Sequence, residues 1–247
     1  MPKFVVMADW DDVPHLSENE KKALLASIPP HQRDARTKGV PQLGSGAIFP
    51  VPEVDVVIDD FDLPEHYARG YGMDVGWNCT AVVWLAFDRE TQVRYIYAIH
   101  KRGEAEPSVH ADAVRSRGIW IPGRIDPASR GRSQRDGTQL IEDYIDQGLF
   151  LDVAPNAVEA GLLEVWRLLS TGQLKVFRSC QPWIEEFRLY RRDQKGRVVK
   201  QNDHLMDATR YAISSGVEWL TQEPESQREE PLIRHMDVGG EYLGWMH

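Results

Sequence analysis

Apolar positions recur along the chain with two periods, and the change from one period to the other outlines the expected fold. Three short runs of apolar, β-branched and aromatic residues follow one another between residues 71 and 100, which predicts a meander of three strands. Beyond them, stretches with an apolar residue every three or four positions alternate with short apolar runs, which predicts alternating helices and strands. A meander followed by this alternation is typical of an α/β fold, a mixed sheet flanked by helices.

Glycines or prolines end most of these stretches and so set the limits of the expected elements. Between the last two helices, residues 192–200 are expected to form a hairpin that turns at Lys195-Gly196. The strands are expected at residues 71–75, 80–87, 93–100, 120–125, 150–153 and 174–177, and the helices at residues 108–117, 140–148, 155–172, 182–191 and 203–220.

The two ends of the chain lack this pattern. A capping box at Ser17 and Glu20 predicts a short helix that stops at Pro29-Pro30. Residues 29–70 are rich in glycine, proline and acids, so we expect a mostly extended arm with one short strand at residues 54–60. Residues 221–247 are acidic and contain glycine, which indicates a flexible tail. The predicted division is an N-terminal arm (1–62), a folded domain (63–220) and a tail (221–247).

Composition narrows the class of protein. Of the 247 residues, 42% are hydrophobic and 27% are charged, which suits one globular domain with attached segments or two small domains. No apolar run approaches the roughly 20 residues that cross a bilayer, and the N-terminus lacks the apolar core of a signal peptide. Cys79 and Cys180 lie far apart without a CxxC motif, which supports neither a disulfide framework nor a thiolate zinc site. We therefore expect no membrane association.

The charge is uneven. A net charge of −9 argues against a protein that coats nucleic acid through its overall field. Two basic clusters stand against this background as candidate phosphate contacts, with solvated surface charge as the alternative. The first cluster contains Arg191, Arg192, Lys195, Arg197 and Lys200, and the second contains Arg130, Arg132 and Arg135.

Three acids lie at the edges of expected elements. Asp74 stands in the turn sequence Gly72-Met-Asp-Val-Gly76, Asp126 follows the strand at residues 120–125, and Asp207 lies in the first turn of the last helix. Carboxylates brought together in a small space need a cation to neutralise them. Mg²⁺ prefers such oxygen ligands, and two such ions can cleave a phosphodiester bond. Asp203, one turn before Asp207, is either a fourth ligand or the N-cap of the helix.

Three longer runs carry a family resemblance. They are GYGMDVGWNCTAVVWLAFD, IDPASRGRSQRDGTQLIEDYIDQGL and NDHLMDATRYAI, and together they resemble the nuclease domain of phage large terminases. The resemblance covers residues 45–220 and implies an RNase H-like fold that cleaves concatemeric double-stranded DNA during genome packaging. It implies Asp74, Asp126 and Asp207 as catalytic, metal-binding acids, Asp203 as an additional ligand, and Mg²⁺ or Mn²⁺, as two ions, as the cofactor. Where many relatives carry a further acid, this chain has His204.

The stretch PPHQRDARTKGVPQLGSGAIFPV resembles the connector that follows the packaging ATPase in large terminases. This implies that the chain is the C-terminal portion of a longer protein. The partners that the resemblance implies are double-stranded DNA, the ATPase of the same protein, the portal or procapsid and the small terminase subunit, all in the host cytoplasm.

Other classes of protein remain open at this stage. Resolvases and transposases share a triad of acids, and a non-catalytic DNA or capsid docking module would use the acids only structurally. Sugar kinases and actin-like ATPases also begin a meander with GxDxG, but they need a second phosphate loop and an adenosine motif that the chain does not show. Residues 54–60 resemble the strand that follows a P-loop, but no GxxxxGK[ST] is present, so we reject a nucleotide site there.

Overall fold

The computed structural model describes residues 10, 17–28, 37, 46–130 and 139–225. Within these residues the chain forms one seven-stranded mixed sheet in the order β1-β7-β4-β3-β2-β5-β6. The central strands β2 (Ala68–Asp74), β3 (Thr80–Phe87) and β4 (Arg94–Arg102) are the expected antiparallel meander. The outer strands pair in parallel and are β1 (Val57–Ile58), β5 (Gly123–Ile125), β6 (Leu151–Val153) and β7 (Leu174–Phe177).

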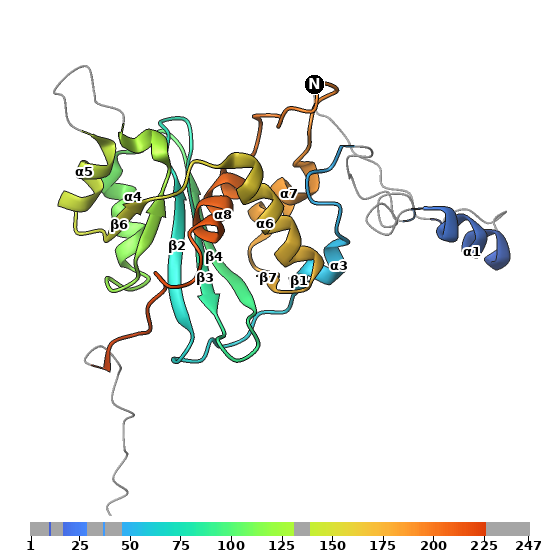
Figure 1. Ribbon diagram of the computed structural model, residues 1–247, viewed down its shortest axis with the longest axis horizontal. Coiled ribbons are helices and arrows are strands. Elements are labelled where there is room, and N and C mark those ends of the chain that lie inside the picture. Colours follow the sequence, from blue (N-terminus) through green and yellow to red (C-terminus); the bar gives the residue numbers. More distant parts are fainter. Residues whose placement is uncertain (1–9, 11–16, 29–36, 38–45, 131–138, 226–247) are drawn as a thin grey trace, which may run out of the picture.

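Helices lie on both sides of this sheet (Figure 1). Three of them, α6 (Val158–Ser170), α7 (Gln181–Leu189) and α8 (His204–Ser214), pack on one face. On the other face lie α4 (Pro107–Arg115) and α5 (Leu140–Asp146). Other helical segments are α1 (Glu18–Ser27), the single turn α3 (Glu53–Val56) and the 3-10 turn η3 (Pro127–Arg130). Within the described residues no helix has the length and apolarity needed to cross a membrane.

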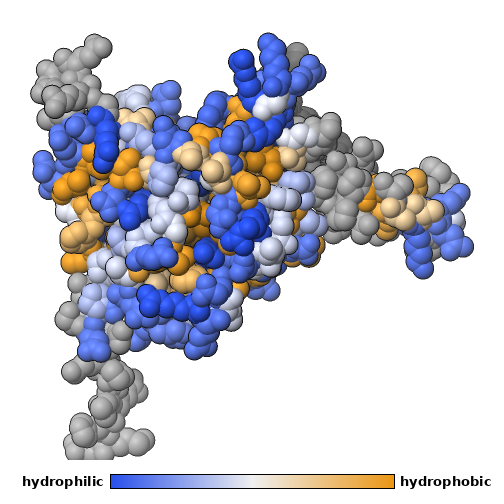
Figure 2. Space-filling view, viewed as in Figure 1, coloured by the Kyte–Doolittle hydropathy of each residue, from blue (hydrophilic) through white to orange (hydrophobic). Residues whose placement is uncertain are grey.

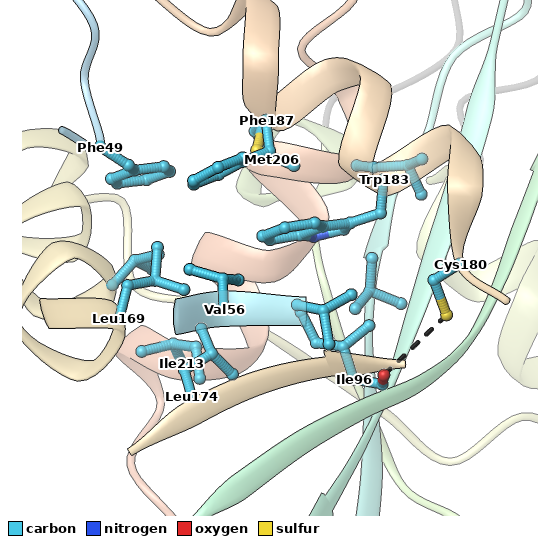
Figure 3. Close-up of a cluster of buried hydrophobic side chains, with 14 of the residues drawn as sticks. Phe49, Val56, Ile96, Leu169, Leu174, Cys180, Trp183, Phe187, Met206 and Ile213 are labelled. Atoms are coloured by element: carbon cyan, nitrogen blue, oxygen red, sulfur yellow. Dashed lines mark hydrogen bonds between the residues drawn. The ribbon is translucent and has the colours of Figure 1, made fainter. Parts of the chain in front are cut away.

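The strand β3 divides the interior into two cores. All eight of its residues are buried, and because side chains alternate along a strand they fall on two faces. Ala81, Val83 and Leu85 pack into the larger core beneath α6, α7 and α8. Figure 3 shows part of this core, where Trp183 and Phe187 of α7 lie close to Met206 of α8 and Phe49. Val82 and Trp84 face the smaller core beneath α4 and α5.

Beyond the N-terminal arm, the expected strands and helices form with limits that differ by up to three residues from the prediction, except for the last helix, which differs more. The last helix stops at Ser214 instead of residue 220, because Gly216 adopts a positive φ of 77° just beyond it and Leu220 then packs against Ala68. The strand expected at residues 120–125 begins at Gly123. The hairpin at residues 192–200 turns back at Gly196 but forms only one isolated bridge, Arg192 with Val198.

The expected N-terminal arm lies partly outside the described residues. The capping box is confirmed, with Ser17 and Glu20 bonding each other at the start of α1. The predicted strand at 54–60 is wrong in its first half, which forms the helical turn α3, and β1 contributes only two residues to the sheet. Phe49, Val51 and Val56 are buried in the larger core, so this part of the arm packs on the domain. The division at residue 62 and the flexible tail stay predictions.

Candidate active site

Asp74, Asp126 and Asp207 meet at one edge of the sheet. Asp74 ends β2, and Asp126 follows β5, which pairs in parallel with β2, so the two strands end side by side. The backbone amide of Asp126 donates to the carbonyl of Met73 at 2.9 Å, which joins the two strand ends. Helix α8 brings Asp207 against this edge. It approaches so closely that a Cβ on Gly72 of β2 would lie 2.0 Å from the carbonyl oxygen of Ala208.

The carboxylate of Asp74 is tied to His204, the first residue of α8. The His204 Nδ1 and Asp74 Oδ2 atoms are 2.8 Å apart. Burial raises the pKa of Asp74, the bond to His204 opposes this, and the charges of Asp207 and Asp126 raise it further. The same bond raises the pKa of His204. The charges of Asp207 and Asp126 therefore act on the Asp74 carboxyl, so the three acids lie close enough to share one electrostatic environment.

The carboxylate of Asp126 is held by α8 and by its own loop. The hydroxyl of Tyr211 donates to Asp126 Oδ1 at 3.0 Å, and the amide of Ala128 donates to the same oxygen at 3.0 Å. Burial and the charge of Asp126 raise the pKa of Tyr211 well above its usual range. The phenol therefore stays protonated as a donor at neutral pH.

The carboxylate of Asp207 lies between two cations. Its Oδ1 accepts from Arg210 Nε at 3.2 Å and Nη2 at 3.1 Å, and its Oδ2 accepts from Lys200 Nζ at 2.7 Å. Both Asp207 and Arg210 are buried, and the Arg210 guanidinium lies 4.4 Å from the centre of the Tyr211 ring. The negative charge gathered at this edge is thus offset by two positive side chains of the same chain.

Asp203 occupies the N-cap position of α8 but does not cap the helix, so the capping interpretation is wrong. Its side chain makes no cap hydrogen bond, and its buried Oδ2 atom lies 3.1 Å from Lys200 Nζ. The cap comes from another helix, because the amide of Leu205 donates to Glu186 Oε2 of α7 at 2.8 Å. This leaves the Asp203 carboxylate facing the other acids.

Glu186 and Lys101 form a supporting pair that the pattern did not single out. Glu186 is buried, and its Oε1 accepts from Lys101 Nζ at 2.6 Å. Lys101 stands across β3 from Asp74, since Asp74 pairs with Ala81 and Ala81 with Lys101. Directly paired residues point to the same face of a sheet, so Lys101 shares the face of Asp74. Finding this pair requires the strand register, which the sequence alone does not provide.

The residues of the two basic clusters lie in different surroundings. Arg192 bonds Glu159 of α6 with both terminal nitrogens, and Lys200 lies among the acids. Arg191 is half-buried, while Lys195 and Arg197 are exposed at the turn. The segment between α7 and α8 forms a hydrophilic projection at the upper edge of Figure 2. In the second cluster, Arg130 is exposed at the end of η3, and Arg132 and Arg135 lie outside the described residues.

The donor set suits a hard divalent cation, although in the described part of the chain no three His, Cys, Asp or Glu side chains are arranged to hold a metal ion. Asp203 and Asp207 are buried carboxylates that share one ammonium group, at 3.1 and 2.7 Å, and the Lys200 side chain that carries it is 64% exposed. A position where two buried carboxylates lie beside one cation fits the oxygen-ligand chemistry of Mg²⁺ or Mn²⁺.

Comparison with known proteins gives consistent matches. The family model described as "Terminase RNaseH-like domain" matches residues 71–215. The large terminase subunits of Enterobacteria phage LP7 and Salmonella phage P22 are each 36% identical to this chain over 208 residues, which is 81% of this chain and 44% and 42% of theirs. The chain therefore spans less than half the length of these curated relatives.

Solved structures extend the comparison. The nuclease domain of the P22 large terminase superposes with a TM-score of 0.66 at 34% identity, covering 72% of this chain and 96% of that one. The large terminase nuclease of the thermophilic phage G20c superposes with a TM-score of 0.52 at 14% identity, covering 68% of this chain and 97% of that one. At this lower identity the second match reports on the fold alone.

Proposed function

Because this chain belongs to the terminase RNase H-like domain family, we propose that it is the nuclease portion of a phage large terminase, an endonuclease that cleaves double-stranded DNA during genome packaging. Its match to nearly the whole of the P22 nuclease domain supports this extent. The observation that carries the proposal is the convergence of Asp74, Asp126 and Asp207 at one edge of an RNase H-like sheet. The reaction class is hydrolysis of a phosphodiester bond.

Four acids would hold the metal: Asp74, Asp126, Asp207 and Asp203. The nuclease domains of the phage G20c large terminase, which share the fold at 15% identity, have been solved with bound cobalt and with bound magnesium, which supports divalent metal use here. We propose Mg²⁺ or Mn²⁺, as two ions. When bound, such ions activate a water molecule and stabilise the leaving oxygen of an in-line displacement.

The chain's own contribution to the reaction is to orient the carboxylates, and α8 does this for all three. His204 holds one oxygen of Asp74, Tyr211 holds one oxygen of Asp126, and Arg210 holds one oxygen of Asp207. Groups that orient metal-binding side chains in this way fix their direction and tune their basicity. One helix therefore sets the direction of three acids that come from three different elements.

DNA would be held by the basic clusters. The exposed Lys195, Arg197 and Arg130 suit contacts with the phosphate backbone, and the proposed set also includes Arg132, Arg135, Arg191, Arg192 and Lys200. Contacts with phosphates carry no base information, so we expect little sequence preference. The ATPase of the same polypeptide, the portal or procapsid and the small terminase subunit are the proposed partners, and the host cytoplasm is the proposed location.

Nicking of supercoiled plasmid DNA tests the proposal. We expect cleavage with Mg²⁺ or Mn²⁺ and none in excess EDTA, and no cleavage by Asp74→Asn, Asp126→Asn or Asp207→Asn. Calorimetric titration with Mn²⁺ is run beside the nicking assay, because metal binding is measured without turnover. Cleavage in excess EDTA contradicts the metal mechanism. A chain that neither cleaves nor binds metal but still binds duplex DNA is instead a docking module.

A further inference from the structure

The Lys200 side chain points toward the acids and not outward, where it could contact a phosphate group. It lies on the segment between α7 and α8, and its Nζ is 2.7 Å from Asp207 Oδ2 and 3.1 Å from Asp203 Oδ2. The two carboxylate side chains are only 10% and 7% exposed, whereas the Lys200 side chain is 64% exposed. The ammonium group of a largely exposed side chain therefore pairs with two buried carboxylates.

Two positive side chains serve Asp207, and they differ in how firmly they are held. Arg210 is 3% exposed and packs against α6, where a Cβ on Gly161 would lie 2.7 Å from the Arg210 Cγ. It also stacks on Tyr211. Lys200 has no comparable packing among the described residues, and its ammonium is bound to the two carboxylates alone. Of the two cations at Asp207, Lys200 is the one that can leave without disturbing the core.

Electrostatics explains why a cation occupies this position. Two carboxylates side by side are unfavourable without a positive charge between them. A lysine side chain is ordinarily an ammonium ion at neutral pH, and the Lys200 Nζ lies 2.7 Å from Asp207 Oδ2 and 3.1 Å from Asp203 Oδ2, so it supplies this charge. A divalent cation carries twice this charge and prefers carboxylate oxygens, so it competes for the same two atoms.

We propose, on the basis of the metal-dependent nuclease proposed above, that Lys200 is a positioning residue: it holds Asp203 and Asp207 in the metal-free protein and is displaced from them by a divalent cation. The acids are thereby kept in place before metal arrives. The displaced ammonium is then available for the phosphate backbone, so Lys200 contacts DNA only in the metal-loaded protein. Metal binding and DNA contact are coupled through this one side chain.

The reactivity of the Lys200 amine measures the displacement directly in the wild-type chain. Limited acetylation followed by peptide mass spectrometry is carried out with and without Mg²⁺. We expect acetylation of Lys200 to rise several-fold with Mg²⁺, because its ammonium is released from two carboxylates. Lys175, which donates to the backbone carbonyl of Asp55, and Lys195, exposed at the turn, are internal controls and should not change. Unchanged reactivity of Lys200 in protein that calorimetry shows to be metal-bound overturns the proposal.

Metal affinity provides the second test. In calorimetric titrations of the full chain with Mn²⁺, Lys200→Gln should bind about tenfold more tightly than wild type, since one partly exposed ion pair no longer competes. Lys175→Gln, at a lysine that bonds the backbone carbonyl of Asp55, should match wild type. Lys200→Arg keeps the charge and should also stay near wild type, which separates competition from a loosened site.

The outcomes distinguish this inference from the proposed function. Equal or weaker Mn²⁺ binding by Lys200→Gln, with binding intact in wild type, contradicts the role of Lys200 alone. Binding by Lys200→Gln where wild type binds only weakly supports it most strongly. Absence of Mn²⁺ binding by both proteins contradicts the metal-dependent nuclease and, with it, the displacement of Lys200.

Discussion

Two neighbouring rows of side chains cross the same three strands and have opposite character. Asp74, Ala81 and Lys101 lie opposite one another on β2, β3 and β4, and the next row contains Met73, Val82 and His100. The first row faces α7 and α8, where His204 and Glu186 meet its charged ends. The second row faces the smaller core, and His100 meets His110 of α4 at 3.0 Å. A shift of one residue along each strand therefore leads from a row with charged ends to a row that faces an apolar core.

Two histidines, His204 beside the first row and His100 in the second, show that the neighbouring group sets the direction of the pKa shift. The bond to Asp74 raises the pKa of His204. Burial lowers the pKa of His100, and the neighbouring His110 and Arg102 lower it further. Both rings are partly buried, so burial alone does not determine the direction. A carboxylate beside the ring favours its charged form, whereas a second ring and an arginine favour its neutral form.

The largest effect is expected from the first row. Asp74→Asn should lower plasmid nicking by more than about a hundredfold, because loss of a group that merely orients a metal ligand already costs up to that factor. The fold should remain, since one carboxylate fewer relieves repulsion. NMR titration should show the His204 pKa falling toward its ordinary value. Nicking by Asp74→Asn at the wild-type rate would contradict the proposed role of Asp74 as a metal ligand.

The next largest effect is expected on stability, from the pair at the far end of the same row. Glu186→Ala leaves Lys101 and the amide of Leu205 without their acceptor and should cost about 3 kcal/mol of unfolding free energy. Glu186→Gln keeps an oxygen acceptor for the Leu205 amide and should cost less. Urea denaturation measures both, and equal losses for the two variants would show that the cap contributes nothing.

A smaller effect distinguishes the rows by pH. His100 and His110 have pKa values below the ordinary 6.5, so on acidification the unfolded chain binds protons that the folded chain does not, and stability falls as pH drops through 6.5. His204 has a raised pKa, so its contribution is present below pH 6.5 and is lost as pH rises through the folded value. Urea denaturation between pH 5 and 8 should show His110→Asn and His204→Asn changing the slope in opposite senses.

The smallest effect is expected directly beside Asp74. Met73 is fully buried in the smaller core, on the face opposite Asp74. Met73→Leu conserves volume and should cost less than about 1.5 kcal/mol. Nicking should stay at the wild-type level, because only the Met73 backbone takes part in joining the strand ends. A large loss of nicking in this variant would mean that the two faces are not independent.

The sequence predicted the fold well where short apolar runs lie in the interior. Residues 80–87 and 174–177 form strands with the expected limits, since both are short apolar runs in the interior. The resemblance to large terminase nucleases and the RNase H-like fold are confirmed by the family and structural matches. The last helix ended early because its limit depends on how Gly216 and Leu220 pack, and local pattern carries little information on that contact.

The site could be predicted only in part. Placing acids at element ends was enough to bring three of them together, because β2 and β5 are parallel neighbours. Helical spacing could also have identified Tyr211, which falls with His204 on the face of α8 that carries Asp207. It could not have shown that Glu186 caps α8 in place of Asp203, or that Glu159 binds Arg192, since both partners come from distant segments.

Gly72 gives the site its dimensions. A methyl group at this position would meet the carbonyl oxygen of Ala208 at 2.0 Å and the Cβ of Ala212 at 3.0 Å, so helix and strand touch through their backbones. The distance between Asp74 on β2 and Asp207 on α8 is therefore set by a residue without a side chain. A chain that kept all four acids but carried a methyl group at residue 72 would force α8 away from β2, and the proposed ligands Asp74 and Asp207 would move apart.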